Sequence, residues 1–309
     1  MKSFAIVGAG ALGSYYGARL AEAGNDVRFL LRADYDEVKK NGLTVESVHG
    51  DFSLPQVTCA RTAEEIGPVD VVIVAWKTTS NQHYEKVITP MVHEDTVILT
   101  LQNGLGNVER LGEIFGLERV MGALCFVCIN RIKAGLIRHS ASGMIVMGEA
   151  TSEASGGVTP RLEELADLFQ ESGIICKVAP NLKEAQWRKL VWNVPFNGLC
   201  ITEGGIDTEV LLAQPDGEEK VRALMFEVVT AARALGYEIE DAFIEAQLER
   251  TLPMGPYRPS SMIDFVEGRE VEVEAIWGEA LRRAQAAGAE VPEMATLYDK
   301  IDSLCRVAR

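Results

Sequence analysis

The sequence predicts an α/β protein in which a mainly parallel sheet with flanking helices is followed by an all-helical region. Up to about residue 180, apolar runs of strand length alternate with helix-like segments, which is the pattern of βαβ units. Beyond that point the strand signals stop and long helical periodicities replace them. A chain of 309 residues is long enough for two domains, and we expect them at 1–182 and 183–309.

The individual elements follow from short apolar runs and helical periodicity. Strands are predicted at 3–7, 26–32, 71–76, 95–103, 119–128, 143–149 and 175–180. Helices are predicted at 14–24, 160–173, 181–197, 217–236, 241–252, 272–288 and 292–306. We expect a flexible surface loop at 149–160, where serine, threonine and glycine gather.

Composition and charge narrow the class of function. The formal net charge of −15 argues against non-specific binding to nucleic acid or anionic membranes, but it does not exclude a small anionic substrate held by local cations. No apolar run approaches the roughly 18 residues of a membrane span, and the N-terminal run suits a first strand better than a signal peptide. We therefore expect a cytoplasmic protein.

The cysteines and histidines give no sign of a metal site. Cys125 and Cys128 have a CxxC spacing, but without a second pair we interpret them as apolar strand residues. The histidines, none of which has a ligand spacing, are His49, His83, His93 and His139. We expect no metal.

A glycine loop after the first strand predicts dinucleotide binding. "GAGALG" supplies Gly8, Gly10 and Gly13 with Ala11 and Leu12 between them, follows a strand and opens a helix. The glycines permit a tight turn, close approach of a pyrophosphate and close packing of helix on strand. The helix N-terminus offers free N–H groups to the phosphates. These features indicate a Rossmann-type domain.

The end of the second predicted strand indicates which dinucleotide is bound. Sites for NAD usually carry a carboxylate there, whereas this strand ends at Arg32, whose guanidinium would pair with a 2′-phosphate. We expect NADP(H). Asp34 and Asp36 lie close by and keep NAD open as an alternative.

Two polar residues follow the third and fourth long strands. Lys77 and Asn103 are placed where ligands bind in doubly wound sheets, outside the carboxyl ends of the strands. They are candidates for contact with the nicotinamide end of the cofactor or with a substrate. The alternatives are that Lys77 is a solvated loop lysine and that Asn103 serves only turn formation before Gly104.

The segment "WRKLVWNVPFN" carries a polar stripe on an apolar helix. Lys189, Asn193 and Asn197 are four residues apart and so share one face. Either that face is wet and the lysine extends outward, or the stripe lines a cleft. In a cleft, a lysine could donate a proton while the amides hold a polar substrate.

Taken with its other motifs, the chain resembles the ketopantoate reductase family over nearly its whole length. The resemblance rests on "GAGALG" with Arg32, Lys77, "LQNG", "WRKLVWNVPFN", "SSM" with Glu272, and "GAEVPEMATLY". It implies that Lys189 is the general acid and that Asn103, Asn193 and Asn197 contact substrate or cofactor. It also implies that Glu272 supports the ketone and the lysine and helps to bind NADP(H).

The resemblance also implies that the substrate carboxylate binds at Ser261 or its neighbour Ser260. Two departures from the family pattern bear on the substrate: Asp207 and Arg258 stand where asparagines are common. Arg258 could itself bind a carboxylate, which would suit a different 2-oxo acid.

The resemblance implies reduction of 2-dehydropantoate to pantoate with NADPH, in pantothenate biosynthesis. The alternatives are a reductase for another branched 2-oxo acid and a sensor that binds NADP(H) without turnover. A sensor needs no proton donor, so the stripe disfavours it. The expected partner is a small-molecule 2-oxo acid, and the sequence leaves a homodimer open.

Overall fold

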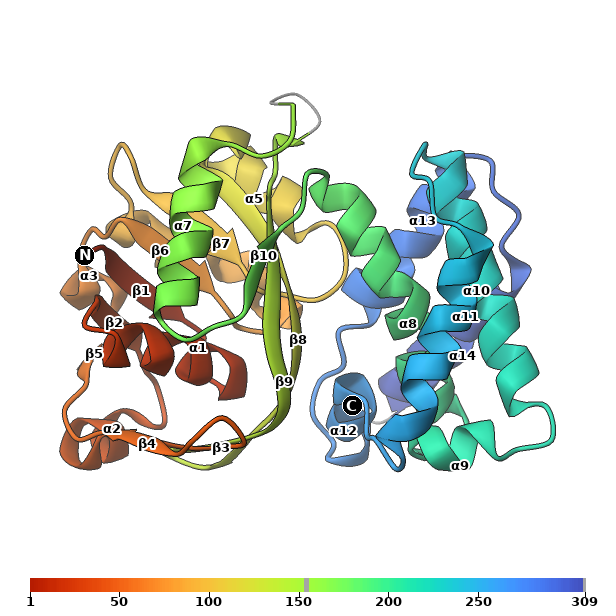
Figure 1. Ribbon diagram of the computed structural model, residues 1–309, viewed down its shortest axis with the longest axis horizontal. Helices are drawn as coiled ribbons and strands as arrows, with labels where there is room; N and C mark the ends of the chain where they lie inside the picture. Colours follow the sequence, from red (N-terminus) through yellow and green to blue (C-terminus); the bar gives the residue numbers. More distant parts are fainter. Residues whose placement is uncertain (153–155, 308–309) are drawn as a thin grey trace. The chain divides into compact units, whose positions relative to one another are not determined.

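The structure, a computed structural model, describes residues 1–152 and 156–307. It divides into two compact units: Met1–Gln102 with Asn107–Leu182, and Asn103–Gly106 with Lys183–Arg309. The first is an α/β unit and the second is helical (Figure 1). The predicted fold class, a Rossmann-type mainly parallel sheet domain and an all-α domain, is confirmed. The short segment 103–106, which sequence boundaries would leave in the first domain, belongs with the helical unit.

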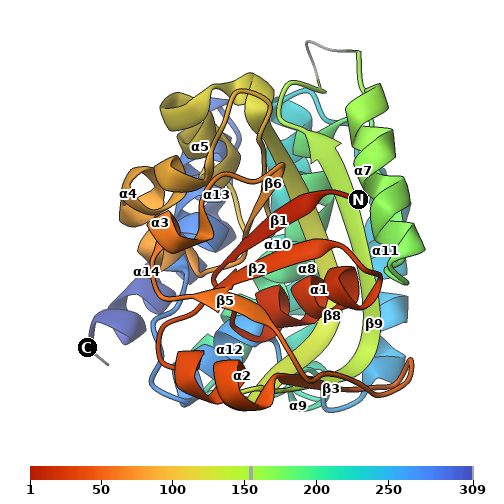
Figure 2. The same cartoon turned by 90° about the vertical axis from the view of Figure 1, so that its left-hand side faces the viewer.

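The first unit is built on one sheet. Its strands are β1 (Ser3–Val7), β2 (Asp26–Leu30), β3 (Leu43–Ser47), β4 (Phe52–Leu54), β5 (Thr58–Ala60), β6 (Val71–Val74), β7 (Val97–Thr100), β8 (Val120–Lys133), β9 (Leu136–Glu149) and β10 (Cys176–Val178). Their order in the described residues is β4-β3-β9-β8-β7-β6-β1-β2-β5, with β10 beside β9. The pairs β3–β4 and β8–β9 are antiparallel and the others are parallel. Figure 2 shows β6, β1, β2 and β5 as successive neighbours.

Helices and short helical turns connect and cover these strands. They are α1 (Ala11–Glu22), α2 (Tyr35–Asn41), α3 (Ala63–Ile66), η1 (Thr78–His83), α4 (Tyr84–Ile88), η2 (Thr89–Met91), α5 (Asn107–Phe115), η3 (Leu117–Arg119) and α7 (Pro160–Glu171). Helix α1 packs against β2, β8 and β9, and α7 packs against β9 and β10. The strands β1 and β6 are buried on both faces because helices cover them, which explains their uninterrupted apolar sequences.

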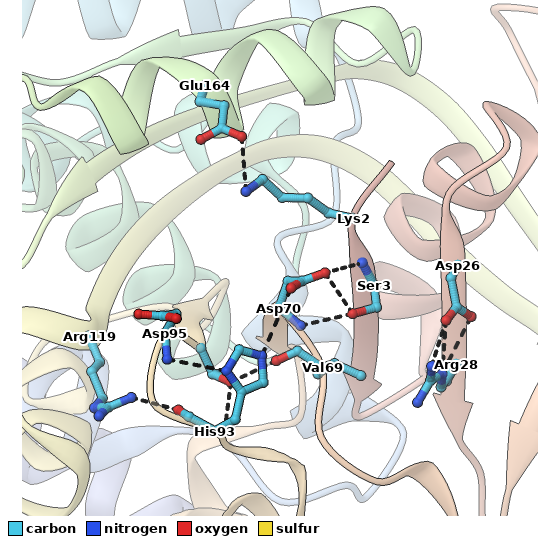
Figure 3. A network of polar contacts seen from close by, with 11 residues as sticks. Lys2, Ser3, Asp26, Arg28, Val69, Asp70, His93, Asp95, Arg119 and Glu164 are labelled. Carbon is cyan, nitrogen blue, oxygen red and sulfur yellow. Dashed lines mark hydrogen bonds and ion pairs between the residues drawn. The ribbon is translucent and has the colours of Figure 1, made fainter.

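A polar network holds the amino ends of β1 and β6 together (Figure 3). The Ser3 backbone N–H and hydroxyl both donate to Asp70 Oδ2 at 2.7 Å, and the Asp70 N–H donates to Ser3 Oγ at 2.9 Å. These hydrogen bonds lower the pKa of Asp70, and the one from the Ser3 backbone N–H has the largest effect. The network lies at the edge opposite the glycine loop and so has a structural role.

The helical unit contains α8 (Leu182–Thr202), α9 (Thr208–Leu212), α10 (Gly217–Ala234), α11 (Asp241–Thr251), η4 (Leu252–Met254), α12 (Ser260–Val266), the π-helical turn η5 (Glu274–Gly278), α13 (Glu279–Ala286) and α14 (Pro292–Val307). Its core is apolar, and Trp187 and Trp277 are its largest buried side chains. No helix in the described ranges has both the length and the apolar content that crossing a membrane demands.

One expectation about loops was wrong in part. The segment 149–160 was predicted to be a flexible surface loop, and Gly156, Val158 and Pro160 are exposed, but Glu149, Ala150 and Ser152 are buried. The Glu149 carboxylate accepts hydrogen bonds from Thr159 and from both Nε and Nη2 of Arg161, which ties the end of β9 to the start of α7. Residues 153–155 of this segment lie outside the described residues. Cys125 and Cys128 both lie in β8, as predicted.

Candidate active site

The glycine loop has the geometry that a phosphate site needs. Gly8 has φ +93°, and a Cβ there would lie 2.2 Å from the backbone nitrogen of Trp76. A Cβ on Gly13 would lie 2.5 Å from the Gly8 carbonyl oxygen, so both positions require glycine. By contrast, a Cβ on Gly10 would meet nothing within 4 Å, and the first turn of α1 carries no acidic residue. The loop residues Ala11 and Leu12 begin this helix, whose N-terminus is open to an anion.

The two carboxylates that kept NAD open as an alternative are both engaged. Asp34 accepts from Arg131, with Nε to Oδ2 at 2.7 Å, and this hydrogen bond raises the pKa of Arg131. Asp36 accepts two hydrogen bonds of 2.7 Å from Arg61. Arg32 is exposed and makes no ion pair within residues 1–152 and 156–307. The edge after β2 therefore presents a guanidinium, with its nearby negative charges neutralised.

Hydrogen bonds order the carboxyl end of β7 next to the segment that carries Lys77. Gln102 accepts from Thr100 and Tyr84, and its amide donates to Asn81 at 2.8 Å. Lys77 directly precedes η1, which contains Asn81. This network of amides and hydroxyls was not predicted from sequence, because its members are scattered along the chain and only Gln102 belongs to a motif, "LQNG".

Trp76 was also missed by the sequence analysis. Its ring stacks on Tyr84 with centroids 5.7 Å apart, and its backbone packs against Gly8. The indole Nε1 is buried and has no acceptor among the described residues. The Trp76 indole N–H is thus an unsatisfied hydrogen-bond donor in the residue that packs against the glycine loop.

In the helical unit, the two asparagines of the polar stripe on α8 are buried and Lys189 is partly buried. Lys189 Nζ donates to Asn103 Oδ1 at 2.8 Å. Asn193 is 8% exposed and Asn197 is 3% exposed. Thus Lys189, Asn193 and Asn197 share one face of α8, and Asn103 belongs to the same unit.

The asparagines of the stripe differ in their partners. Asn197 Oδ1 accepts from the backbone N–H of Ser261 at 3.0 Å, which joins α8 to the start of α12. The Asn193 amide makes no hydrogen bond within the described part of the chain, although it is more than nine-tenths buried. Asn193 is not among the described residues with a fully buried, unpartnered polar atom, so its amide is still accessible. An accessible amide on a mostly buried side chain fits a ligand contact.

The remaining predicted residues lie on the segments around α12. Ser261 is buried next to Asn197, whereas Ser260 and Arg258 are exposed. Glu272 is 9% exposed and lies two residues before the π-helical turn η5. Of the two serines, Ser261 is therefore the one that contacts the stripe.

One departure from the family pattern has a structural explanation. Asp207 is the N-cap of α9, and its Oδ1 accepts from the Val210 N–H at 2.9 Å. Aspartate and asparagine cap helices about equally well, so Asp207 preserves the cap.

Both units thus carry residues suited to one type of chemistry. The first unit has an open helix N-terminus, a glycine cradle and a free guanidinium, which fit the pyrophosphate and 2′-phosphate of a dinucleotide. The helical unit has an ammonium group, buried amides and a serine, which fit a small oxygen-rich acid.

Comparisons with known proteins identify the family to which the chain belongs. Residues 4–152 match the family model "Ketopantoate reductase PanE/ApbA", and residues 181–304 match "Ketopantoate reductase PanE/ApbA C terminal". A 2-dehydropantoate 2-reductase from Nostoc sp. is 42% identical over 304 residues, covering 98% of this chain and 95% of the relative. The crystal structure of 2-dehydropantoate 2-reductase from Geobacter metallireducens is 45% identical with a TM-score of 0.94, covering 97% of this chain and 99% of that chain.

A more distant structure shares the fold alone. D-mandelate dehydrogenase with NADH and anilino(oxo)acetate is 22% identical, with a TM-score of 0.87 and 99% coverage of both chains. The match of both family models over most of the chain identifies the class, a two-unit reductase with a Rossmann-type sheet. The chain belongs to the ketopantoate reductase PanE/ApbA family, which confirms the resemblance seen in its motifs.

Proposed function

We propose that this protein reduces the C2 ketone of 2-dehydropantoate to the alcohol of pantoate with NADPH, a step of pantothenate biosynthesis. The observation that carries the proposal is the set of polar groups on α8: Lys189 hydrogen-bonded to Asn103, and the buried amides of Asn193 and Asn197 beside it. The named relatives, of which one is 42% identical, support the same reaction.

In this mechanism NADPH supplies a hydride to the ketone carbon when it is bound. Lys189 donates a proton to the ketone oxygen as negative charge develops there, and Asn103 orients the Lys189 ammonium group by accepting its hydrogen bond. Asn193 and Asn197 hold the substrate's polar groups, and Ser261 binds its carboxylate. Glu272 supports the lysine and ketone and contributes to cofactor binding.

The cofactor is held by residues of the first unit. The N–H groups of the loop Gly8–Gly13 bind the pyrophosphate, and Lys77 contacts the nicotinamide end. Arg32 binds the 2′-phosphate, which the neutralised Asp34 and Asp36 no longer disfavour. This arrangement supports NADP(H) over NAD.

The first test follows NADPH absorbance with 2-dehydropantoate and a panel of branched 2-oxo acids. Lys189→Ala should lower kcat by about 10²–10⁴-fold, the usual contribution of a general acid. Its affinity for NADPH, measured by fluorescence titration, should stay close to that of the unmodified protein. Near-normal turnover in this variant would remove Lys189 from the proposed role.

The cofactor assignment has its own test. Arg32→Asp should weaken NADPH binding far more than NADH binding, because only NADPH loses a charge-assisted pair and gains a repulsion. Equal effects on the two cofactors would contradict the 2′-phosphate role.

A second candidate is a reductase of another branched 2-oxo acid. The exposed Arg258, three residues before Ser261, favours it because a guanidinium can bind a carboxylate that an asparagine would bind less strongly. In the same assay, a higher kcat/KM for another member of the panel would select this candidate.

A further inference from the structure

The segment Asn103–Gly106 is anchored in the helical unit by three contacts of different kinds. The Leu105 side chain is 3% exposed and belongs to the apolar core of that unit. The Leu105 N–H donates to the Ala275 carbonyl oxygen at 2.8 Å. The third contact is the close approach of Gly104 to the backbone of Ala275.

Only glycine fits at position 104. Its φ is +80°, a conformation that residues with a side chain rarely adopt. A Cβ there would lie 2.1 Å from the Ala275 carbonyl oxygen and 2.4 Å from the carbonyl carbon. Because these atoms are backbone, they cannot move aside as the end of a flexible side chain could.

The contact partner, Ala275, lies in an irregular helical turn. Residues Glu274–Gly278 form a π-helical turn, and π turns mostly occur as single insertions, frequently at functional sites. Here the Ala275 carbonyl accepts a hydrogen bond from outside the helix, from Leu105. The turn begins two residues after Glu272.

The same segment carries Asn103, whose Oδ1 accepts the Lys189 hydrogen bond. We propose that Gly104, through its contact with the Ala275 carbonyl, is a positioning residue that fixes Asn103 and thereby orients the Lys189 ammonium group. This inference rests on the proposed function, because it assigns Gly104 a part in the proton donation. Gly104 itself touches no reacting atom.

Gly106 offers a matched control. It lies in the same segment with φ +86°, so alanine strains the backbone at both positions. A Cβ on Gly106 would meet its nearest neighbour, Glu279 Cγ, only at 3.6 Å. The two substitutions therefore share the backbone strain, and Gly104→Ala alone forces the segment away from Ala275.

The experiment compares both alanine variants by NADPH oxidation with 2-dehydropantoate or the best substrate of the panel. Gly104→Ala should lower kcat by about ten- to a hundredfold, since an error of about 1 Å in a catalytic group can cost that much. The alkaline limb of its pH profile for kcat should move to lower pH, because the Lys189 ammonium form loses its acceptor. Gly106→Ala should keep kcat and the pH profile close to those of the unmodified protein.

A double substitution separates positioning from a general loss of structure. In an Asn103→Ala background, Gly104→Ala should cost no more kcat than Gly106→Ala does, because its effect acts through Asn103. An equal loss of kcat with and without Asn103, or equal effects of the two glycine substitutions, would overturn the inference. An inactive unmodified protein would instead refute the proposed function.

If Gly104→Ala does not fold, the side-chain anchor provides the same test. Leu105→Ala and Leu224→Ala each shorten a leucine that is 3% exposed in the same core, and of the two only Leu105 belongs to the segment that carries Asn103. Leu105→Ala should lower kcat and move the alkaline limb, whereas Leu224→Ala should only lower stability. Equal kinetics in the two folded variants would again overturn the inference.

Discussion

Replacing Asn197 by alanine should lower stability, whereas replacing Asn193 by alanine should not. Asn197→Ala leaves the Ser261 N–H buried without an acceptor, which costs about 1–3 kcal/mol. Asn193→Ala removes an amide that has no partner within the described residues, so no hydrogen bond is lost. Alanine also favours the helix over asparagine by up to about 0.7 kcal/mol at both sites. The net expectation is a loss of about 1–2 kcal/mol for Asn197→Ala and no loss, or a small gain, for Asn193→Ala.

Urea unfolding followed by tryptophan fluorescence provides the measurement. Trp187, Trp192 and Trp277 all belong to the helical unit, so the signal reports mainly on the unit that contains α8. Under the proposed function both variants should lose kcat/KM for the 2-oxo acid. The difference in stability then separates a residue proposed to contact only the ligand, Asn193, from one that also holds the start of α12, Asn197. The reasoning is refuted if Asn193→Ala destabilises the helical unit as much as Asn197→Ala does.

The remaining predictions concern the first unit. Arg161→Ala removes the cation paired with the fully buried Glu149 carboxylate, so the free energy of unfolding should fall by an amount near the lower end of about 3–5 kcal/mol. Adding Glu149→Gln should recover part of this loss in urea unfolding. No recovery would contradict a charge effect. His139 is buried and hydrogen-bonded to Ser47 and Ala141. Because the Ala141 carbonyl can only accept, Nε2 donates to it and Nδ1 accepts from the Ser47 hydroxyl. This pattern suits a neutral imidazole ring. Burial is the main cause that lowers the pKa of His139 from its ordinary value of 6.5. The contribution of His139 to the stability of the fold is therefore fully present above pH 6.5 and declines as the pH falls below it. His139→Gln should flatten the fall in melting temperature between about pH 7 and pH 5, and an unchanged slope would refute this assignment.

The strands that the sequence predicted are those with apolar residues throughout. The runs at β1, β6 and β7 are buried on both faces, so hydrophobicity alone identifies them. The strands β3, β4 and β5 were not predicted, because they are partly exposed and contain polar residues, and β4 and β5 have only three residues each. Helix α2 was missed for the same reason, since Val38 is its only buried residue.

For the candidate site, sequence periodicity established which residues share a face but not what they contact. The spacing of Lys189, Asn193 and Asn197 fixes their common side of α8, whereas a wet face and a lined cleft have the same spacing. Burial of both asparagines argues against the wet face, and the lined cleft stays a prediction. The contact between Leu105 and Ala275 joins residues 170 positions apart, and no local pattern could predict it.

The helical unit is discontinuous in sequence, because it includes the four-residue segment Asn103–Gly106. The ribosome makes this segment long before the helices of the same unit. During translation, Leu105 emerges before any of the helices it will pack against, so this part of the core can close only late. A fragment beginning at Lys183 would leave a leucine-sized hole in its core and the Ala275 carbonyl without its donor. The two units therefore cannot be exchanged between relatives as simple N- and C-terminal halves unless the segment Asn103–Gly106 travels with the helices.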